Sequence, residues 1–188
     1  MAKQFAALEP THRDFIARQH VFFTASAAPL DREGGLSRVN VSPRSTDCLR
    51  VLGDNAVAYL DRTGSGNETA AHARGGGNAT IMFCAVDGPP LILRLYGHAT
   101  VLPAGGAEYD RLLAEAFDGN EPLGARQIVR LDFDLVQTSC GYGVPLFDYA
   151  GERPSMDNWA VKKEAGEGLE AYRARENARS LDGLDTGI

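Results

Sequence analysis

The chain has 188 residues, of which 44% are hydrophobic and 23% charged, so it is long enough to bury the core of one globular domain. Its net charge of −6 argues against general nucleic-acid binding, and no apolar run reaches the roughly 20 residues that a membrane span needs. Three widely separated cysteines without a Cys-x-x-Cys pair, and four histidines without metal-ligand spacing, predict a reduced cytoplasmic protein without a disulfide framework or a metal site.

The first third of the chain predicts one short helix and then strands. Thr11 is expected to cap a helix over residues 11–20, and the aromatic and β-branched run over residues 20–27 predicts a strand. Residues 36–43 alternate, and the two faces carry Val39 and Val41 on one side and Arg38, Asn40 and Ser42 on the other. The segments "CLRVL" and "AVAYLD" flank a "GDN" turn and predict a hairpin.

The rest of the chain adds longer strands and charged helices. Strands are expected over residues 79–87, 90–103 and 126–139, and the last of these places Val129, Leu131, Phe133 and Leu135 inward. An amphipathic helix is expected over residues 107–117, and "NETAAHAR" predicts a short helix before three glycines. The tail from residue 152 is charged and helical, with Gly166 and Gly168 dividing it in two. Because helices do not alternate with the strands, we expect a mainly β fold, an antiparallel barrel with peripheral helices.

The stretch "DRTGSGNETAAH", residues 61–72, has the composition of a ligand-binding loop. It lacks the lysine of a Walker A loop, and Thr69 stands where a Rossmann motif needs its third glycine. Ser65 and Glu68 have the spacing of a capping box, so a helix is expected to begin near Gly66. Two interpretations stay open, namely a capped helix without a ligand and an anion site at the helix start.

Four segments together resemble the pyridoxamine 5′-phosphate oxidase-like family, the FMN-binding split barrels. They are "SRVNVSPRS" (37–45), "VAYLDRTGSGNETAAH" (57–72), "IMFCAVDGPPLILRLYGHATVL" (81–102) and "VQTSCGYGVPLFDYAGER" (136–153). The resemblance covers roughly residues 15–153 in order. It implies a six-stranded antiparallel split barrel over residues 1–153, to which we expect a helical C-terminal extension, residues 154–188, to be packed.

The resemblance also implies a homodimer with FMN at the subunit interface, hydride transfer through the flavin, and a small-molecule substrate. The residues that it assigns to the cofactor lie on two segments, and they are Arg38, Val39, Asn40, Val41, Ser42, Asp61, Thr63, Ser65, Gly66 and Asn67. It identifies no catalytic side chain, because the cofactor supplies the chemistry. A deazaflavin in the same fold is the alternative cofactor.

One departure from the family pattern bears on the function. The oxidases proper usually carry a basic Ser-Arg-Lys cluster where this chain has Ser65, Gly66 and Asn67. We therefore expect a reaction other than the vitamin B6 oxidation, with Arg38, Arg44 or Arg62 supplying the missing positive charge. The alternative functions are a non-catalytic flavin-binding or sensing protein and a deazaflavin-dependent reductase.

Three further side chains are candidates for a functional or structural role. Cys140 lies just past a strand without an adjacent base, which favours an inert thiol over a nucleophile. His98 shares a polar strand face with Arg94 and Tyr96, which is more typical of a solvated face than of a pocket. Trp159 is expected to pack the tail onto the barrel.

Overall fold

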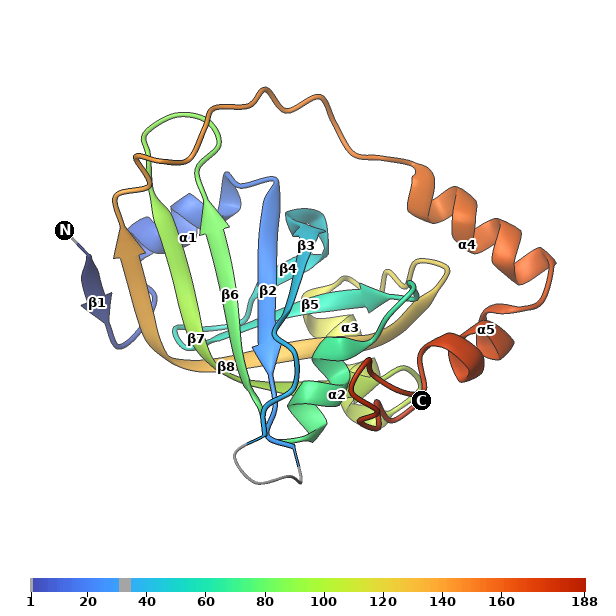
Figure 1. Cartoon of the computed structure of the whole chain (residues 1–188). Coiled ribbons are helices and arrows are strands. Elements are labelled where there is room, and N and C mark those ends of the chain that lie inside the picture. The colour runs from blue at the N-terminus through green and yellow to red at the C-terminus, as the bar shows by residue number, and fades with distance from the viewer. Residues whose placement is uncertain (1, 31–34) are drawn as a thin grey trace.

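The alternating segments form one antiparallel sheet (Figure 1). The computed structural model describes residues 2–30 and 35–188, and within them six strands have six or more residues. They are β2 (Val21–Ala27), β3 (Asn40–Ser45), β5 (Ala56–Arg62), β6 (Asn78–Cys84), β7 (Ile92–Pro103) and β8 (Ala125–Ser139). Two three-residue strands, β1 (Lys3–Phe5) and β4 (Leu49–Val51), bring the sheet to eight strands in the described part of the chain. The split-barrel fold is confirmed. The sheet has two short strands more than the six that the resemblance implies, and one of them, β4, lies in the segment "CLRVL" expected to form a hairpin.

The order of the strands leaves an open seam in the barrel. The order is β3-β2-β6-β7-β8-β5-β4, with the short β1 paired to β8 alone, so β3 and β4 end the main order and β1 is a further edge. The seam is the line along which β3 faces the end of β5 without pairing to it. Side chains of β3 reach β5 and the segment after it, because Arg44 binds Asp61 and Asn40 binds Thr69. The expected hairpin is confirmed by the pairing of β4 with β5.

Two apolar clusters lie on opposite faces of β5. Inside the barrel, Val57 and Tyr59 join Phe22, Phe83 and Leu95, all at most 1% exposed. On the outer face, Ala58 and Leu60 pack with Tyr109, Phe117 and Ile128, near α3 (Ala107–Ala116). Because β5 is covered on both faces, polar side chains at its end are forced to pair with one another.

A β-bulge in the longest strand pair corrects one expected register. Tyr96 pairs with Leu135 and Gly97 with Phe133, so Asp134 is the extra residue on β8. The bulge reverses the alternation beyond Phe133, so Val136 is fully buried and Leu135 is not, contrary to the expectation for Leu135. Gly97 is required at this point because a Cβ atom there would lie 2.0 Å from the carbonyl oxygen of Asp132.

Helices cover the ends and one side of the barrel. The first, α1 (Pro10–Ala17), begins at Pro10 after Glu9 as N-cap, so Thr11 is not its cap. The short helix α2 (Glu68–Arg74) packs through Ala70 and Ala71, which are buried against the sheet. A single 3-10 turn, η1 (Thr46–Cys48), links β3 to β4. None of the helices in the described ranges is long and apolar enough to cross a membrane.

The C-terminal extension contains two helices, α4 (Ser155–Ala165) and α5 (Leu169–Glu176), divided at Gly166 and Gly168 as expected. An extended segment connects β8 to α4 across one end of the sheet (Figure 1), and the ring of Tyr149 in it stacks on His20 at 3.7 Å. Trp159 packs edge-on against Tyr172 in α5, with ring centroids 5.2 Å apart, so it joins the two helices to each other. The division into units 1–153 and 154–188 stays a prediction.

Candidate functional site

Strand β3 presents two different faces along the seam. Val39 and Val41 are 70% and 60% exposed, although they are the apolar residues of the segment. Asn40 and Ser42 point the other way, where the Asn40 amide donates to Thr69 Oγ1 (3.2 Å) and the Ser42 hydroxyl donates to Asn40 Oδ1 (3.2 Å). Residues 39–42 therefore alternate as predicted, with Val39 and Val41 turned to the surface, although β3 itself begins only at Asn40.

Arg38, at the start of this segment, is bound by the C-terminal tail. Its backbone N–H donates to Asp182 Oδ2 (2.7 Å), and its guanidinium forms an ion pair with the same carboxylate. The Arg38 side chain is 71% exposed, whereas that of Asp182 is 7% exposed. A residue that the resemblance assigns to the cofactor thus already holds an anionic group.

Asp61, at the end of β5, is the centre of a buried ionic cluster. Its Oδ1 accepts from Arg44 Nη1 (2.6 Å), and its Oδ2 accepts from Arg126 Nε and Gln127 Nε2 (both 2.8 Å). Burial on its own would raise the pKa of this carboxyl, but Arg44 and Arg126 lower the pKa below its ordinary value. Asp61 is therefore ionised, and its carboxylate is used in holding the cluster together.

The loop after β5, residues 63–67, is held by hydrogen bonds to β8, to the segment before it and to α5. Thr63 donates its hydroxyl to the Gly124 carbonyl (2.9 Å) and accepts from Arg173 Nε (2.7 Å). Asn67 accepts from Gln127 Nε2 (2.8 Å), while its own buried Nδ2 has no hydrogen-bond partner among the described residues. Ser65 and Gly66 are exposed.

The expected capping box is wrong. Helix α2 begins at Glu68, with Asn67 as N-cap and no side-chain cap hydrogen bond. The Glu68 carboxylate instead accepts from the backbone N–H of Leu181 (3.0 Å), which belongs to the C-terminal tail. The tail was not expected at this place. In a capping box Glu68 would accept from the backbone N–H of Ser65, and here the N–H of Leu181 is the donor instead.

Two residues that sequence reasoning missed join the loop to the tail. Arg126 donates through Nη2 to the Gly66 carbonyl and through Nη1 to Asn177 Oδ1 (both 2.9 Å). Asn177, which is fully buried, donates in turn to the Gly64 carbonyl (2.9 Å). Only the unusual polar pair Arg126–Gln127 at the start of an otherwise alternating strand could have signalled these contacts from the sequence.

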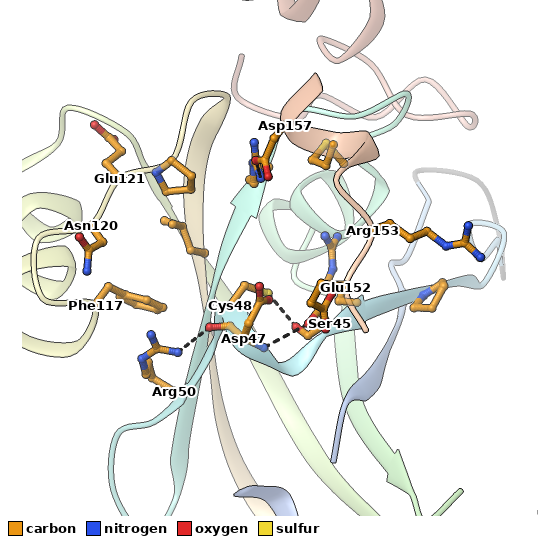
Figure 2. Close-up of a pocket in the computed structure, with 16 residues that line it drawn as sticks. Ser45, Asp47, Cys48, Arg50, Phe117, Asn120, Glu121, Glu152, Arg153 and Asp157 are labelled. Atoms are coloured by element: carbon orange, nitrogen blue, oxygen red, sulfur yellow. Dashed lines mark hydrogen bonds and ion pairs between the residues drawn. The ribbon is translucent and has the colours of Figure 1, made fainter. Parts of the chain in front are cut away.

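A cleft of about 700 Å³ opens beside this cluster, between the ends of β3 and β5 (Figure 2). Its lining includes Pro43 and Arg44 directly after Ser42, and Leu60 and Arg62 on either side of Asp61. Figure 2 shows Arg50 and Phe117 on one side of the cleft, facing Ser45, Glu152 and Arg153 on the other. The predicted cofactor residues do not line this cleft themselves, and they continue from its edge along the seam.

The cleft combines cationic and apolar surface. The Arg50 guanidinium lies over the Phe117 ring at 5.1 Å and donates to the carbonyls of Ala116 (3.1 Å) and Asp47 (2.7 Å). Arg62 forms an ion pair with Asp157 in α4 (2.7 Å). Burial raises the pKa of the Cys48 thiol to about 12, so this cysteine is no nucleophile at neutral pH. The lining of the cleft therefore combines arginine side chains, carboxylates and the apolar side chains of Leu60 and Phe117.

The remaining candidates lie away from the cleft. Cys140 and His98 are exposed. His72 of α2, which was not a candidate, is buried, and its ring nitrogen Nδ1 lies 2.9 Å from Ser26 Oγ. Within residues 2–30 and 35–188, no three His, Cys, Asp or Glu side chains lie together in a way that could hold a metal ion.

Comparison with known proteins agrees with this architecture. The family model for pyridoxamine 5′-phosphate oxidase matches residues 8–140. The pyridoxamine 5′-phosphate oxidase family protein ustO of Aspergillus flavus is 35% identical over 194 aligned residues, which cover 96% of this chain and 76% of ustO. The crystal structure of HupZ from Group A Streptococcus is similar, with 17% identity, a TM-score of 0.50, and coverage of 68% of this chain and 91% of HupZ. The crystal structure of a histidine-to-alanine variant of HupZ has a TM-score of 0.52 at 17% identity, and the match covers 70% of this chain and 98% of the variant.

Proposed function

This chain belongs to the pyridoxamine 5′-phosphate oxidase family, and from that premise we propose that it is an FMN-binding oxidoreductase with a substrate other than vitamin B6. FMN, when bound, supplies hydride transfer at its N5 atom. The protein's part is to bind and orient the cofactor and to shape the substrate site. The proposed assembly is a homodimer with the cofactor at the interface.

The observation that supports this proposal most is the composition of the seam. Exposed Val39 and Val41 offer apolar contact for a planar ring or a second subunit, and they alternate with the polar side chains of Asn40 and Ser42. Nearby, the buried Nδ2 of Asn67 is a donor without an acceptor in the described part of the chain. Because buried donors are nearly always paired, this atom fits an acceptor group of a bound ligand. These features of the seam support the proposed flavin site.

The exposed apolar strip also supports the proposed dimer. Leu36, Val39 and Val41 are 68%, 70% and 60% exposed; Val41 lies on the edge strand β3, and the other two lie in the segment that precedes it. An edge strand with exposed apolar side chains is a surface that natural proteins usually cover. A second copy of the chain over β3 would bury these side chains and enclose the seam.

Arg38→Ala tests the assigned cofactor residues. Charge-assisted hydrogen bonds contribute about 1.5–3 kcal/mol, so loss of a contact to the FMN phosphate should weaken FMN binding roughly tenfold or more. Flavin-fluorescence titration measures the Kd, and Arg13→Ala, which removes a distant surface ion pair with Asp54, is the matched control. An FMN affinity unchanged by Arg38→Ala would remove Arg38 from the site.

A non-catalytic flavin-binding or sensing protein is the second candidate. The observation that favours it is the exposed Ser65–Gly66 corner, where the oxidases proper carry basic residues. Stopped-flow reduction of the FMN-loaded protein by NADH or NADPH separates the two functions. Tight FMN binding without reduction would favour the non-catalytic protein. A preference for a deazaflavin over FMN would favour a deazaflavin-dependent reductase.

A further inference from the structure

The tail after α5 folds into a tight turn, residues 180–184, which carries Asp182 near its tip. The backbone N–H of Gly183 donates to the Ser180 carbonyl (3.0 Å), and the φ of Gly183 is +81°, a conformation that favours glycine. Ser180 also donates its N–H to the Leu184 carbonyl (2.9 Å) and accepts the Leu184 N–H at its hydroxyl (3.0 Å). The turn is therefore held by hydrogen bonds of its own, so it can move as a unit.

Two neighbouring residues of this turn bind the two segments to which the resemblance assigns the cofactor. The Asp182 carboxylate binds Arg38, which begins the first segment, through both its backbone N–H (2.7 Å) and its guanidinium. The Leu181 N–H donates to the carboxylate of Glu68 (3.0 Å), directly after Asn67 at the end of the second segment. Figure 1 shows the C-terminal segment beside α2. The turn thus bridges the two segments.

At Arg38, the Asp182 carboxylate occupies donors that a phosphate group would also use. A backbone N–H and a guanidinium both donate to carboxylate and to phosphate oxygens. The Arg38 side chain is 71% exposed and can be reached from solvent, whereas that of Asp182 is only 7% exposed. An external anion can therefore approach the guanidinium, but it can accept from the Arg38 N–H only if Asp182 leaves.

The tail is anchored before the turn by buried contacts and beyond the turn by exposed ones. On the near side, Asn177 is fully buried and binds Arg126 and the Gly64 carbonyl (both 2.9 Å). On the far side, Asp185 pairs with Arg74 at 3.2 Å, and their side chains are 55% and 50% exposed. Exposed ion pairs stabilise little, because water competes for both charges. Asn177 can therefore stay bound while the turn moves away from Arg38.

We propose that the turn over residues 180–184 is a latch, in which Asp182 occupies the anion position at Arg38 until an external phosphate group displaces it. The inference rests on the proposed function for the source of that phosphate, which is FMN. A protein whose binding-competent state is only partly populated binds its ligand more weakly in proportion to that fraction. The closed latch therefore lowers the FMN affinity of the full-length chain.

Asp182→Asn tests the latch because it removes the ion pair with Arg38 and keeps the length of the chain. If the latch is closed in about nine of ten molecules, the variant should bind FMN roughly tenfold more tightly, as measured by flavin-fluorescence titration. Asp185→Asn is the matched control, since it removes the same charge from the same tail but pairs with Arg74, and it should bind FMN like the wild type. In an Arg38→Ala background, Asp182→Asn should have a much smaller effect, because the shared partner is gone.

Amide hydrogen exchange in the full-length wild type tests displacement without relying on a flavin. The Leu181 N–H loses its Glu68 acceptor when the turn leaves, so exchange in residues 180–186 should become roughly threefold faster or more. Inorganic phosphate should produce this change at matched ionic strength, whereas chloride should not. FMN should produce it as well, and riboflavin, which lacks the phosphate, should not.

The outcomes separate the latch from the proposed function. Faster exchange with inorganic phosphate in a protein that binds no flavin would support the latch and overturn only the proposed function. Exchange in residues 180–186 that is indifferent to both phosphate and FMN would overturn the latch, and the proposed function would stand if the protein binds FMN. Equal FMN affinities of Asp182→Asn and Asp185→Asn would overturn the latch in the same way.

Discussion

Asp61→Asn is the substitution that perturbs the seam most directly. The carboxylate accepts three hydrogen bonds, from Arg44, Arg126 and Gln127, and it neutralises one of two buried positive charges. An asparagine has the same shape, but its amide nitrogen is a donor and would face a donor of Arg44, Arg126 or Gln127. The variant therefore keeps the packing and loses the charge compensation.

The expected cost is large for a single polar change. Removing one partner of a buried ion pair typically costs about 3–5 kcal/mol, and here two guanidiniums lose their partner at once. The total stability of a domain is about 5–15 kcal/mol, and 1 kcal/mol corresponds to roughly 2–4 °C in Tm at this chain length. We therefore expect Asp61→Asn to lower the Tm by about 10 °C or more, measured by differential scanning calorimetry.

Asp157→Asn is the matched control, because Asp157 pairs with Arg62 at a similar distance but is 69% exposed. Exposed ion pairs contribute about 0–1 kcal/mol, so this variant should unfold almost like the wild type. If Asp61→Asn cost no more than Asp157→Asn, the cluster would not be the ionic centre described above. Combining Asp61→Asn with Arg44→Gln should recover part of the loss, since the second change removes one of the unpaired cations.

Further predictions concern pH, the bulge and the tail. The folded-state pKa of Asp61 is lowered, so its contribution to stability is present above about pH 4 and is lost as the pH falls below that value. The Tm of Asp61→Asn should therefore fall less with acidification than the Tm of the wild type. Gly97→Ala should destabilise the protein by about 3 kcal/mol, because its Cβ would lie 2.0 Å from the Asp132 carbonyl, whereas Gly64→Ala meets no described atom within 4 Å and should have little effect. Asn177→Ala should cost about 1–3 kcal/mol and increase amide hydrogen exchange in residues 177–186, since Arg126 and the Gly64 carbonyl lose their partner; exchange unchanged in that segment would mean that Asn177 does not fasten the tail.

The strands and their antiparallel arrangement could be predicted from the sequence because they depend on local patterns. Alternation over residues 90–103 and 126–139 gave the two longest strands, and the glycines at 166 and 168 gave the break between α4 and α5. The bulge at Asp134 was not predicted, because it depends on the register between β7 and β8. The alternation within one strand carries no information on that register.

The candidate site was predictable only in part, because its contacts join segments far apart in the chain. Asp61 was singled out, but its partners Arg126 and Gln127 lie about 65 residues away at the start of β8, and the polarity of this pair does not indicate which residue it binds. Glu68 has capping-box spacing, yet it binds Leu181, 113 residues away. Local propensity cannot show which distant segment will supply a donor, so the capping box was a reasonable prediction that the tail overrode.

The most direct test of flavin binding is the visible absorption spectrum of the freshly purified protein, followed by mass spectrometry of any released cofactor. The proposed function predicts yellow flavin absorbance, either as purified or after FMN is added and the excess removed, with one FMN per chain. A colourless protein that retains no flavin after such loading would contradict it.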